Sequence, residues 1–130
     1  MERRIEDVQY CERLFQSFYD IGSTSQGGVT RLGYSETEDA MHEVFKGLGR
    51  ELGASVITDE VGNTYVTNTD EDGYTLIGSH LDSVIEGGRY DGVAGVMAGR
   101  RRMESGSRFG SGRSGVRSPV ILGAVRSVVD

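Results

Sequence analysis

The chain has 130 residues, a mass of 14.1 kDa and a net charge of −6. This length suits one domain with one core. A single cysteine excludes an internal disulfide framework, and the longest strongly apolar run, residues 120–125, is far shorter than the ~20 residues of a membrane span. The first residues lack the apolar segment of a secretory signal, so we expect a cytoplasmic protein without a membrane partner.

Charge is distributed unevenly along the chain. Residues 1–99 hold seven basic and 18 acidic side chains, a net charge of −11. Residues 100–130 hold seven arginines against Glu104 and Asp130, a net charge of +5, within an Arg/Gly/Ser-rich sequence. We therefore predict a domain over residues 1–99 and a tail over residues 100–130, either disordered or derived from a truncated or frame-shifted reading.

An amphipathic helix is predicted from about Ile5 to Phe18, because apolar residues recur there at intervals of three to four. Cys11 falls on or near the apolar stripe, where a small buried hydrophobe is the favoured interpretation. A loop rich in Gly and hydroxyl side chains follows over residues 22–31.

A second helix is predicted to begin near Ser35 and to end at Gly53. Ser35 and Glu38 have the spacing of a capping box, and Gly is common just after a helix. The apolar face of this helix carries Met41, Val44, Phe45, Leu48 and Leu52. His42 lies among charged residues on the flank, so we expect a solvated side chain and not a metal ligand.

Three strand candidates follow at residues 54–59, 63–68 and 74–79. Glu60-Val61-Gly62 between the first two predicts a hairpin turn. A Gly-rich segment over residues 86–92 leads into a third helix from Val93 to about Met103, and residues 120–125 have the character of a strand. Interleaved helices and strands predict an α/β fold.

His80 and Asp82 stand two residues apart at the end of the third predicted strand. Side chains alternate along a strand, so both are expected on the same side. A metal-binding imidazole usually donates its other N–H to a carboxylate or carbonyl, and a His-x-Asp sequence can supply that acceptor. A polar strand end is the alternative interpretation of this pair.

Asp91 follows a Gly87-Gly88 turn and precedes the third predicted helix. One carboxylate can bridge two cations that lie ~3.5–4 Å apart, and the glycines allow the loop to fold back towards His80. A helix N-cap, worth ~1 kcal/mol, explains Asp91 equally well. The spacing alone leaves both interpretations open.

The segment from Gly78 to Val96, GSHLDSVIEGGRYDGVAGV, resembles the first metal-binding motif of the dinuclear metal amidohydrolases and peptidases of aminoacylase/carboxypeptidase type. It is most similar to the hydantoinase/carbamoylase branch, which includes N-carbamoyl-L-amino-acid hydrolase and allantoate amidohydrolase. Residues 27–32 and 59–63 resemble two upstream stretches of that branch, in the same order. The resemblance covers about residues 5–99.

The resemblance implies the N-terminal part of a catalytic domain with a mixed sheet flanked by helices, truncated and without the lid/dimerisation domain. It implies that His80 is a ligand of one metal, that Asp91 bridges two metals, and that Asp82 orients His80. The implied cofactors are two divalent ions, with zinc the first choice and manganese, cobalt or nickel compatible with similar ligands. Full-length relatives are expected to be homodimers.

The implied activity is hydrolysis of a linear amide or carbamoyl C–N bond in a small molecule, such as an N-carbamoyl-L-amino acid or an allantoate-like substrate. The family site also needs a Glu-Glu pair, which supplies the general base, and two further His. Neither occurs after residue 99. A tight zinc site usually has three or four ligands, so we expect weak metal binding and little turnover from this chain.

Two other functions remain open. One is a non-catalytic fragment whose apolar faces need a partner. The other is nucleic-acid binding by the Arg-rich tail, which the charge of −11 on the rest of the chain disfavours.

Overall fold

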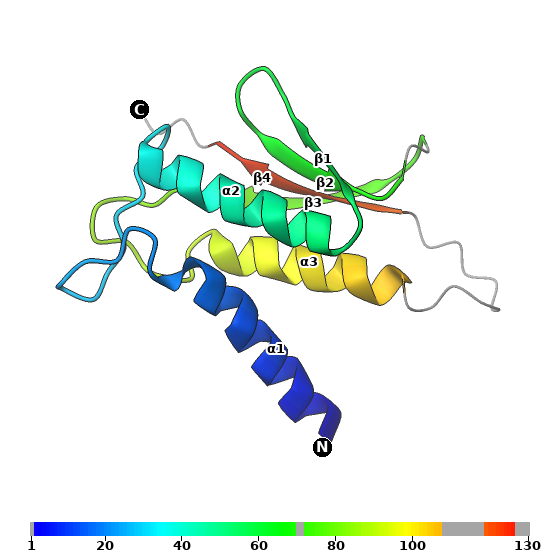
Figure 1. Ribbon diagram of the computed structural model, residues 1–130, viewed down its shortest axis with the longest axis horizontal. Coiled ribbons are helices and arrows are strands. Elements are labelled where there is room, and N and C mark those ends of the chain that lie inside the picture. Colours follow the sequence, from blue (N-terminus) through cyan, green and yellow to red (C-terminus); the bar gives the residue numbers. More distant parts are fainter. Residues whose placement is uncertain (1, 70–71, 108–118, 127–130) are drawn as a thin grey trace.

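A computed structural model describes residues 2–69, 72–107 and 119–126 (Figure 1). Its elements, in chain order, are α1 (Glu2–Tyr19), α2 (Glu36–Glu51), β1 (Ser55–Thr58), β2 (Thr64–Thr67), β3 (Thr75–His80), α3 (Val93–Ser107) and β4 (Val120–Val125). Every predicted helix and strand is present, which confirms the α/β class. Within the described ranges, no helix is both long and apolar enough to cross a membrane.

The four strands form one mixed sheet in the order β1-β2-β4-β3. β1 and β2 are an antiparallel hairpin, as predicted, and β2 also runs antiparallel to β4. β3 and β4 are parallel, with His80 opposite Val125, and α3 connects them across one face of the sheet. The parallel pair therefore brings the carboxyl ends of β3 and β4 to the same edge of the sheet.

α2 and α3 pack on the same face of the sheet. Gly49 of α2 lies against Val66, and Gly99 of α3 lies against Leu122, which is the register partner of Val66. A side chain at Gly99 would collide with Leu122, so glycine permits this close approach. On the opposite face of the sheet, Ile57 of β1 is 53 % exposed.

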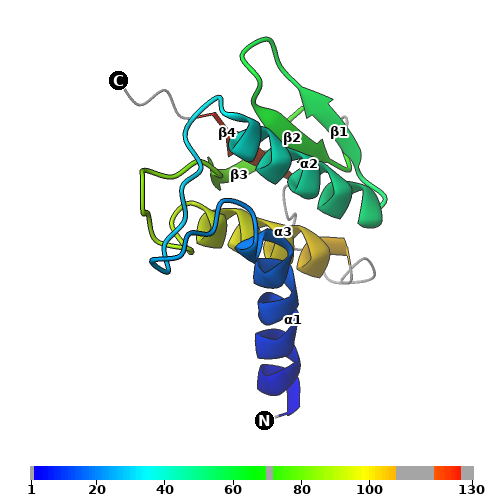
Figure 2. The same cartoon turned by 60° about the vertical axis from the view of Figure 1, so that its left-hand side comes forward.

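α1 contacts both other helices, and its N-terminal end extends beyond them (Figure 2). Leu14 and Phe18, near its end, are buried in the core. Ile5 and Val8, which belong to the predicted apolar stripe, are 54 % and 58 % exposed. Cys11 is half-buried, so its interpretation as a small buried hydrophobe is only partly right.

α2 begins and ends where the sequence predicts. Ser35 is its N-cap and accepts a hydrogen bond from the backbone N–H of Glu38, while the Glu38 carboxylate accepts one from the N–H of Tyr34. Gly53 follows the helix in the left-handed region, with φ of 70°. Met41 and Phe45 on the predicted apolar face are buried.

The prediction of a solvated His42 is wrong. This side chain is 1 % exposed, and its Nδ1 lies 2.9 Å from the hydroxyl of Thr64 in β2. His42 follows Met41 on α2, on the side that packs against the sheet, and the charged neighbours in sequence occupy other positions around the helix. Thr64 is also buried and provides the polar partner that a buried imidazole requires.

The fold continues past the predicted boundary at residues 99 and 100. α3 crosses that point, and β4 lies between β2 and β3 in the sheet. Three arginines of the predicted tail, Arg100, Arg101 and Arg126, form ion pairs with carboxylates of residues 1–99. Residues 108–118, which carry most of the Arg/Gly/Ser-rich sequence, lie outside the described residues, so their origin and nucleic-acid binding stay predictions.

Candidate functional site

The three predicted site residues meet at the edge of the sheet where β3 ends. His80 is the last residue of β3, Asp82 stands two residues beyond it, and Asp91 stands two residues before the start of α3. His80 Nε2 lies 3.9 Å from Asp91 Oδ2, and its Nδ1 lies 3.1 Å from Asp82 Oδ1. The loop between Asp82 and Asp91 therefore folds back over the end of β3.

Asp82 occupies the Nδ1 side of the His80 ring. Its backbone carbonyl lies 3.0 Å from Nδ1, beside the carboxylate oxygen at 3.1 Å. Both atoms are acceptors, so together they favour the tautomer that carries its hydrogen on Nδ1. The side chain of Asp82 is 5 % exposed, and burial holds it in this place. Nε2, on the other side of the ring, faces Asp91.

Asp91 presents its carboxylate to Nε2 of His80 from the solvent side. The two atoms lie 3.9 Å apart, a separation that one bound cation can span. Zn–N and Zn–O distances are about 2.0–2.1 and 2.0–2.2 Å, so one ion can touch both atoms at this separation. The donor set of one imidazole nitrogen and one carboxylate oxygen also suits zinc, manganese, cobalt and nickel.

The alternative interpretation of Asp91 as a helix N-cap is not supported. α3 begins at Val93, and the bond between Asp91 and Val93 uses the backbone carbonyl of Asp91. Within the described part of the chain, the Asp91 carboxylate accepts no hydrogen bond from the helix. Its side chain is 68 % exposed, and its carboxylate lies 3.9 Å from Nε2 of His80.

Gly92 lets the loop approach His80 closely. Its φ is 71°, in the region that favours glycine, and a Cβ there would lie 2.6 Å from Nδ1 of His80. Gly92 thus lies directly against the ring of His80. Sequence reasoning gave it no role, although a glycine directly after a candidate ligand and before a helix was the available signal.

Two side chains do not complete a metal site by themselves. Across residues 2–69, 72–107 and 119–126, the structure contains no group of three or more His, Cys, Asp or Glu side chains that could hold an ion. Asp82 faces the Nδ1 side of His80, so among the described residues at this edge Nε2 of His80 and the Asp91 carboxylate are the two groups that could hold an ion.

The loop over residues 22–31 braces the loop that carries Asp91. Val29 and Gly87 exchange backbone hydrogen bonds of 3.0 and 2.7 Å. Arg31 and Ser83 form a second pair, in which the Ser83 N–H donates to the Arg31 carbonyl and the Ser83 hydroxyl accepts from the Arg31 N–H. The two segments that resemble the same family are therefore joined in space.

Arg31 also connects these two hydrogen-bonded loops to α1. Its guanidinium donates to the carbonyls of Phe18 and Ile21, at 2.8 and 2.7 Å, and the side chain is almost fully buried. The carbonyls at a helix end lack partners within the helix, and Arg31 satisfies them. Sequence reasoning missed this role, because nothing in the loop's composition shows which carbonyls it will reach.

Buried polar groups lie behind the site, on α2. Burial lowers the pKa of His42 to about 4, and the positive charges of Arg126 and Lys46 act in the same direction. His42 is therefore neutral at pH 7. Burial raises the pKa of Glu38, against the opposing effects of its hydrogen bond from Tyr34 and the charge of Arg126.

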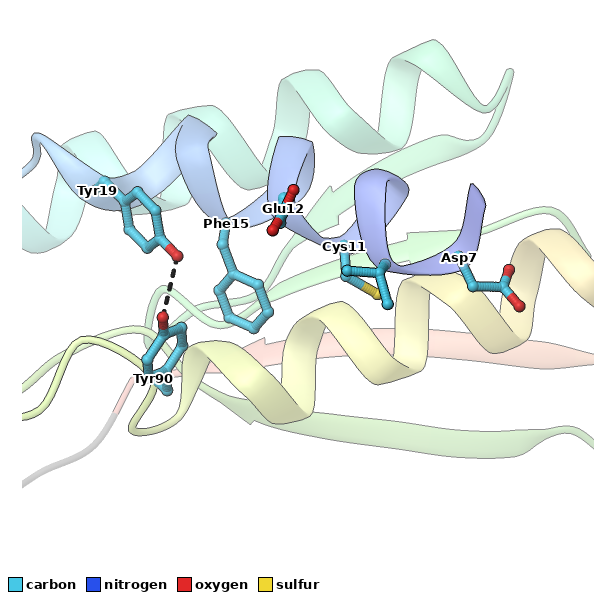
Figure 3. A pocket seen from close by; sticks show the side chains of 7 residues that line it. Asp7, Cys11, Glu12, Phe15, Tyr19 and Tyr90 are labelled. Carbon is cyan, nitrogen blue, oxygen red and sulfur yellow. Dashed lines mark hydrogen bonds between the residues drawn. The ribbon is translucent and has the colours of Figure 1, made fainter. Parts of the chain in front are cut away.

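An open groove of about 350 Å³ runs along α1 beside the site (Figure 3). Its apolar floor includes Cys11 and Phe15, and Asp7 and Glu12 lie on its rim. Tyr90, the residue before Asp91, closes one end, where its hydroxyl lies 3.2 Å from that of Tyr19.

No family model matches the chain. N-carbamoyl-L-amino acid amidohydrolase of Geobacillus stearothermophilus is 40 % identical over 95 residues, which are 68 % of this chain and 23 % of that protein. Allantoate amidohydrolase of Bacillus subtilis is 41 % identical over 95 residues, which are 70 % of this chain and 22 % of that protein. The chain thus spans about a quarter of the length of these relatives.

Comparison with solved structures indicates the same family as the sequence comparison. A hydantoinase/carbamoylase family amidase from Burkholderia ambifaria superposes with a TM-score of 0.69 and 32 % identity, over 88 % of this chain and 29 % of that protein. The corresponding amidase from Burkholderia multivorans gives a TM-score of 0.74 at 28 % identity, over 88 % and 28 %. In sequence and in fold, the chain belongs to the hydantoinase/carbamoylase branch of the amidohydrolases.

Proposed function

We propose that this chain supplies part of the metal centre of an amidohydrolase that cleaves a linear amide or carbamoyl C–N bond. The observation that carries the proposal is the 3.9 Å separation between Nε2 of His80 and Oδ2 of Asp91. The names of the relatives support the bond type, because they act on N-carbamoyl amino acids or allantoate.

His80 and Asp91 would hold the divalent ions, with Asp91 as the carboxylate shared between two of them. Zinc is the first choice, and manganese, cobalt and nickel suit the same donors. When bound, such an ion polarises the scissile carbonyl and lowers the pKa of a bound water to about 7.

The side chains of this chain have distinct tasks in that reaction. Asp82 keeps the hydrogen of His80 on Nδ1, so that Nε2 stays available as a ligand. Gly92 keeps the space beside the ring open. Asp91 brings the negative charge that offsets the charge of the cations, and its exposed position leaves the centre accessible from solvent.

For the substrate class, the assembly and the location, we propose what the resemblance to the family implies. A small N-carbamoyl-L-amino acid or an allantoate-like molecule is the proposed substrate, and a cytoplasmic homodimer is the proposed full-length form. Two ligands bind a metal more weakly than the three or four of a tight zinc site. We therefore expect this chain to bind metal weakly and to turn over little substrate by itself.

A titration with Mn²⁺ tests the location of the centre. Paramagnetic Mn²⁺ broadens the NMR signals of nearby nuclei even when it binds weakly. The proposal predicts that signals of His80, Asp91 and Gly92 broaden first. Earlier broadening at another acidic segment, such as residues 36–39, would place the cation elsewhere and contradict the proposal.

A further inference from the structure

Tyr90 and Asp91 are neighbours in the chain that face different parts of the molecule. The Asp91 carboxylate faces His80, whereas the Tyr90 ring packs against α1 (Figure 3). The Tyr90 ring meets Phe15 edge-on at 5.0 Å and Tyr19 at 6.3 Å between ring centroids. We call these three residues, Phe15, Tyr19 and Tyr90, the aromatic clamp.

Asp91 itself makes few interactions that would hold it in place. Its side chain is 68 % exposed, and throughout the described residues its carboxylate accepts no hydrogen bond. The backbone N–H of Asp91 makes a 3.3 Å bond to the Gly88 carbonyl, near the long end of the usual range. The location of the carboxylate therefore depends on the residues on either side of it.

Those two neighbours are both fixed, and by different means. Gly92 lies against the ring of His80. Tyr90 is fixed by the aromatic clamp, and its carbonyl accepts a 2.9 Å hydrogen bond from Ala94 in α3. Arg89 adds to this attachment, because its guanidinium carbon lies 5.8 Å from the centre of the Tyr19 ring. The segment thus has one anchor on α1 and another beneath His80.

We infer that Tyr90 is a positioning residue: by packing into the aromatic clamp, it sets the Asp91 carboxylate opposite Nε2 of His80. This inference rests on the proposed function for its relevance to metal binding. Its physical basis is independent of a metal, because the packing of Tyr90 belongs to the chain itself. Without the ring, the segment keeps its anchor at Gly92, and its attachment to α1 is reduced to the contact of Arg89 with Tyr19.

Three variants isolate the role of the ring. Tyr90→Ala removes it, Tyr90→Phe keeps the ring but loses the hydroxyl contact with Tyr19, and Tyr74→Ala removes a comparably exposed tyrosine before β3. Tyr90 is 56 % exposed, so the alanine variant should fold, which circular dichroism checks. Mn²⁺ affinity and the amide hydrogen exchange of residues 88–94 are measured for each.

Loss of a residue that orients a ligand typically weakens metal affinity by about 10–100-fold. We expect Tyr90→Ala to weaken Mn²⁺ binding about tenfold and to speed exchange at residues 88–94 without metal. Tyr90→Phe should stay within about twofold of the wild type in affinity, because the edge-on packing is retained. Tyr74→Ala should leave both measurements unchanged.

Unchanged exchange at residues 88–94 in Tyr90→Ala would overturn the inference, and so would faster exchange with unchanged Mn²⁺ affinity. A wild-type chain that binds no Mn²⁺ would refute the proposed function instead. The exchange measurement would then still decide whether the ring holds the Asp91 segment, so the two failures are distinguishable.

Discussion

The guanidinium of Arg126 lies 2.6 Å from the Glu38 carboxylate, which is completely buried on α2. A second contact of 2.6 Å joins Arg126 to Asp39, and its backbone N–H donates to Asn63. Arg126 stands one residue beyond β4, whose last residue is the register partner of His80. The arginine therefore fastens α2 and the β1–β2 hairpin to the edge of the sheet that carries the candidate site.

Removing this arginine should destabilise the protein strongly. Arg126→Ala leaves Glu38 as a buried carboxylate without its cation, and such a loss typically costs about 3–5 kcal/mol of unfolding free energy. Urea denaturation measures the change, with Arg13→Ala, an exposed arginine of α1, as the control. A loss below about 1 kcal/mol would mean that the ion pair contributes little to the fold.

The stability of the chain should fall in mild acid because of His42. The pKa of His42 is about 4 in the fold and 6.5 when unfolded. At a pH between these values, the unfolded chain therefore binds a proton that the native chain does not bind. The contribution of His42 to the free energy of unfolding is fully present above pH 6.5. It declines by up to about 3 kcal/mol as the pH falls towards 4.

His42→Gln tests this pH dependence, because glutamine cannot take up a proton but can still hydrogen-bond to Thr64. Urea unfolding at several values from pH 7 to pH 4 should give a flatter profile for the variant than for the wild type. The raised pKa of Glu38 acts on both proteins and largely cancels in the difference. Parallel profiles would contradict a buried neutral His42.

Gly92→Ala should disturb the candidate site where Gly88→Ala does not. A Cβ at position 92 meets His80 and needs a φ of 71°, whereas a Cβ at position 88 has nothing within 4 Å. We expect Gly92→Ala to lose about 1–3 kcal/mol of stability, with shifted NMR signals of the His80 ring. Equal stability and equal His80 spectra in both variants would show that the ring does not lie against Gly92.

Local sequence signals predicted most of the elements in this fold. The capping pair Ser35 and Glu38 and the glycine at position 53 act through neighbouring residues, so they can be recognised without tertiary structure. His42 was misjudged because its neighbours in sequence are charged, whereas its burial depends on a contact with β2. The position of β4 between β2 and β3 could not be predicted from the sequence either, because strand order depends on long-range pairing.

In the candidate site, too, the local features could be predicted from the sequence and the long-range contacts could not. The spacing of His80, Asp82 and Asp91 suggested that they meet, but the spacing could not choose between a ligand and an N-cap for Asp91. The contacts of Arg31 and Tyr90 link segments more than 50 residues apart with a hydrogen bond or a ring contact. Such contacts leave no periodic pattern in the sequence, so the parts that hold the site could not be predicted.

Metal binding to matched variants tests the central claim most directly. The wild type, His80→Ala, Asp91→Ala and the exposed control Glu60→Ala are titrated with Zn²⁺ by calorimetry, and their folding is checked by circular dichroism. We expect weak Zn²⁺ binding by the wild type and by Glu60→Ala, with a loss of at least about tenfold in affinity for each of the other two variants. Equal Zn²⁺ affinity in all four proteins would contradict a cation held between His80 and Asp91.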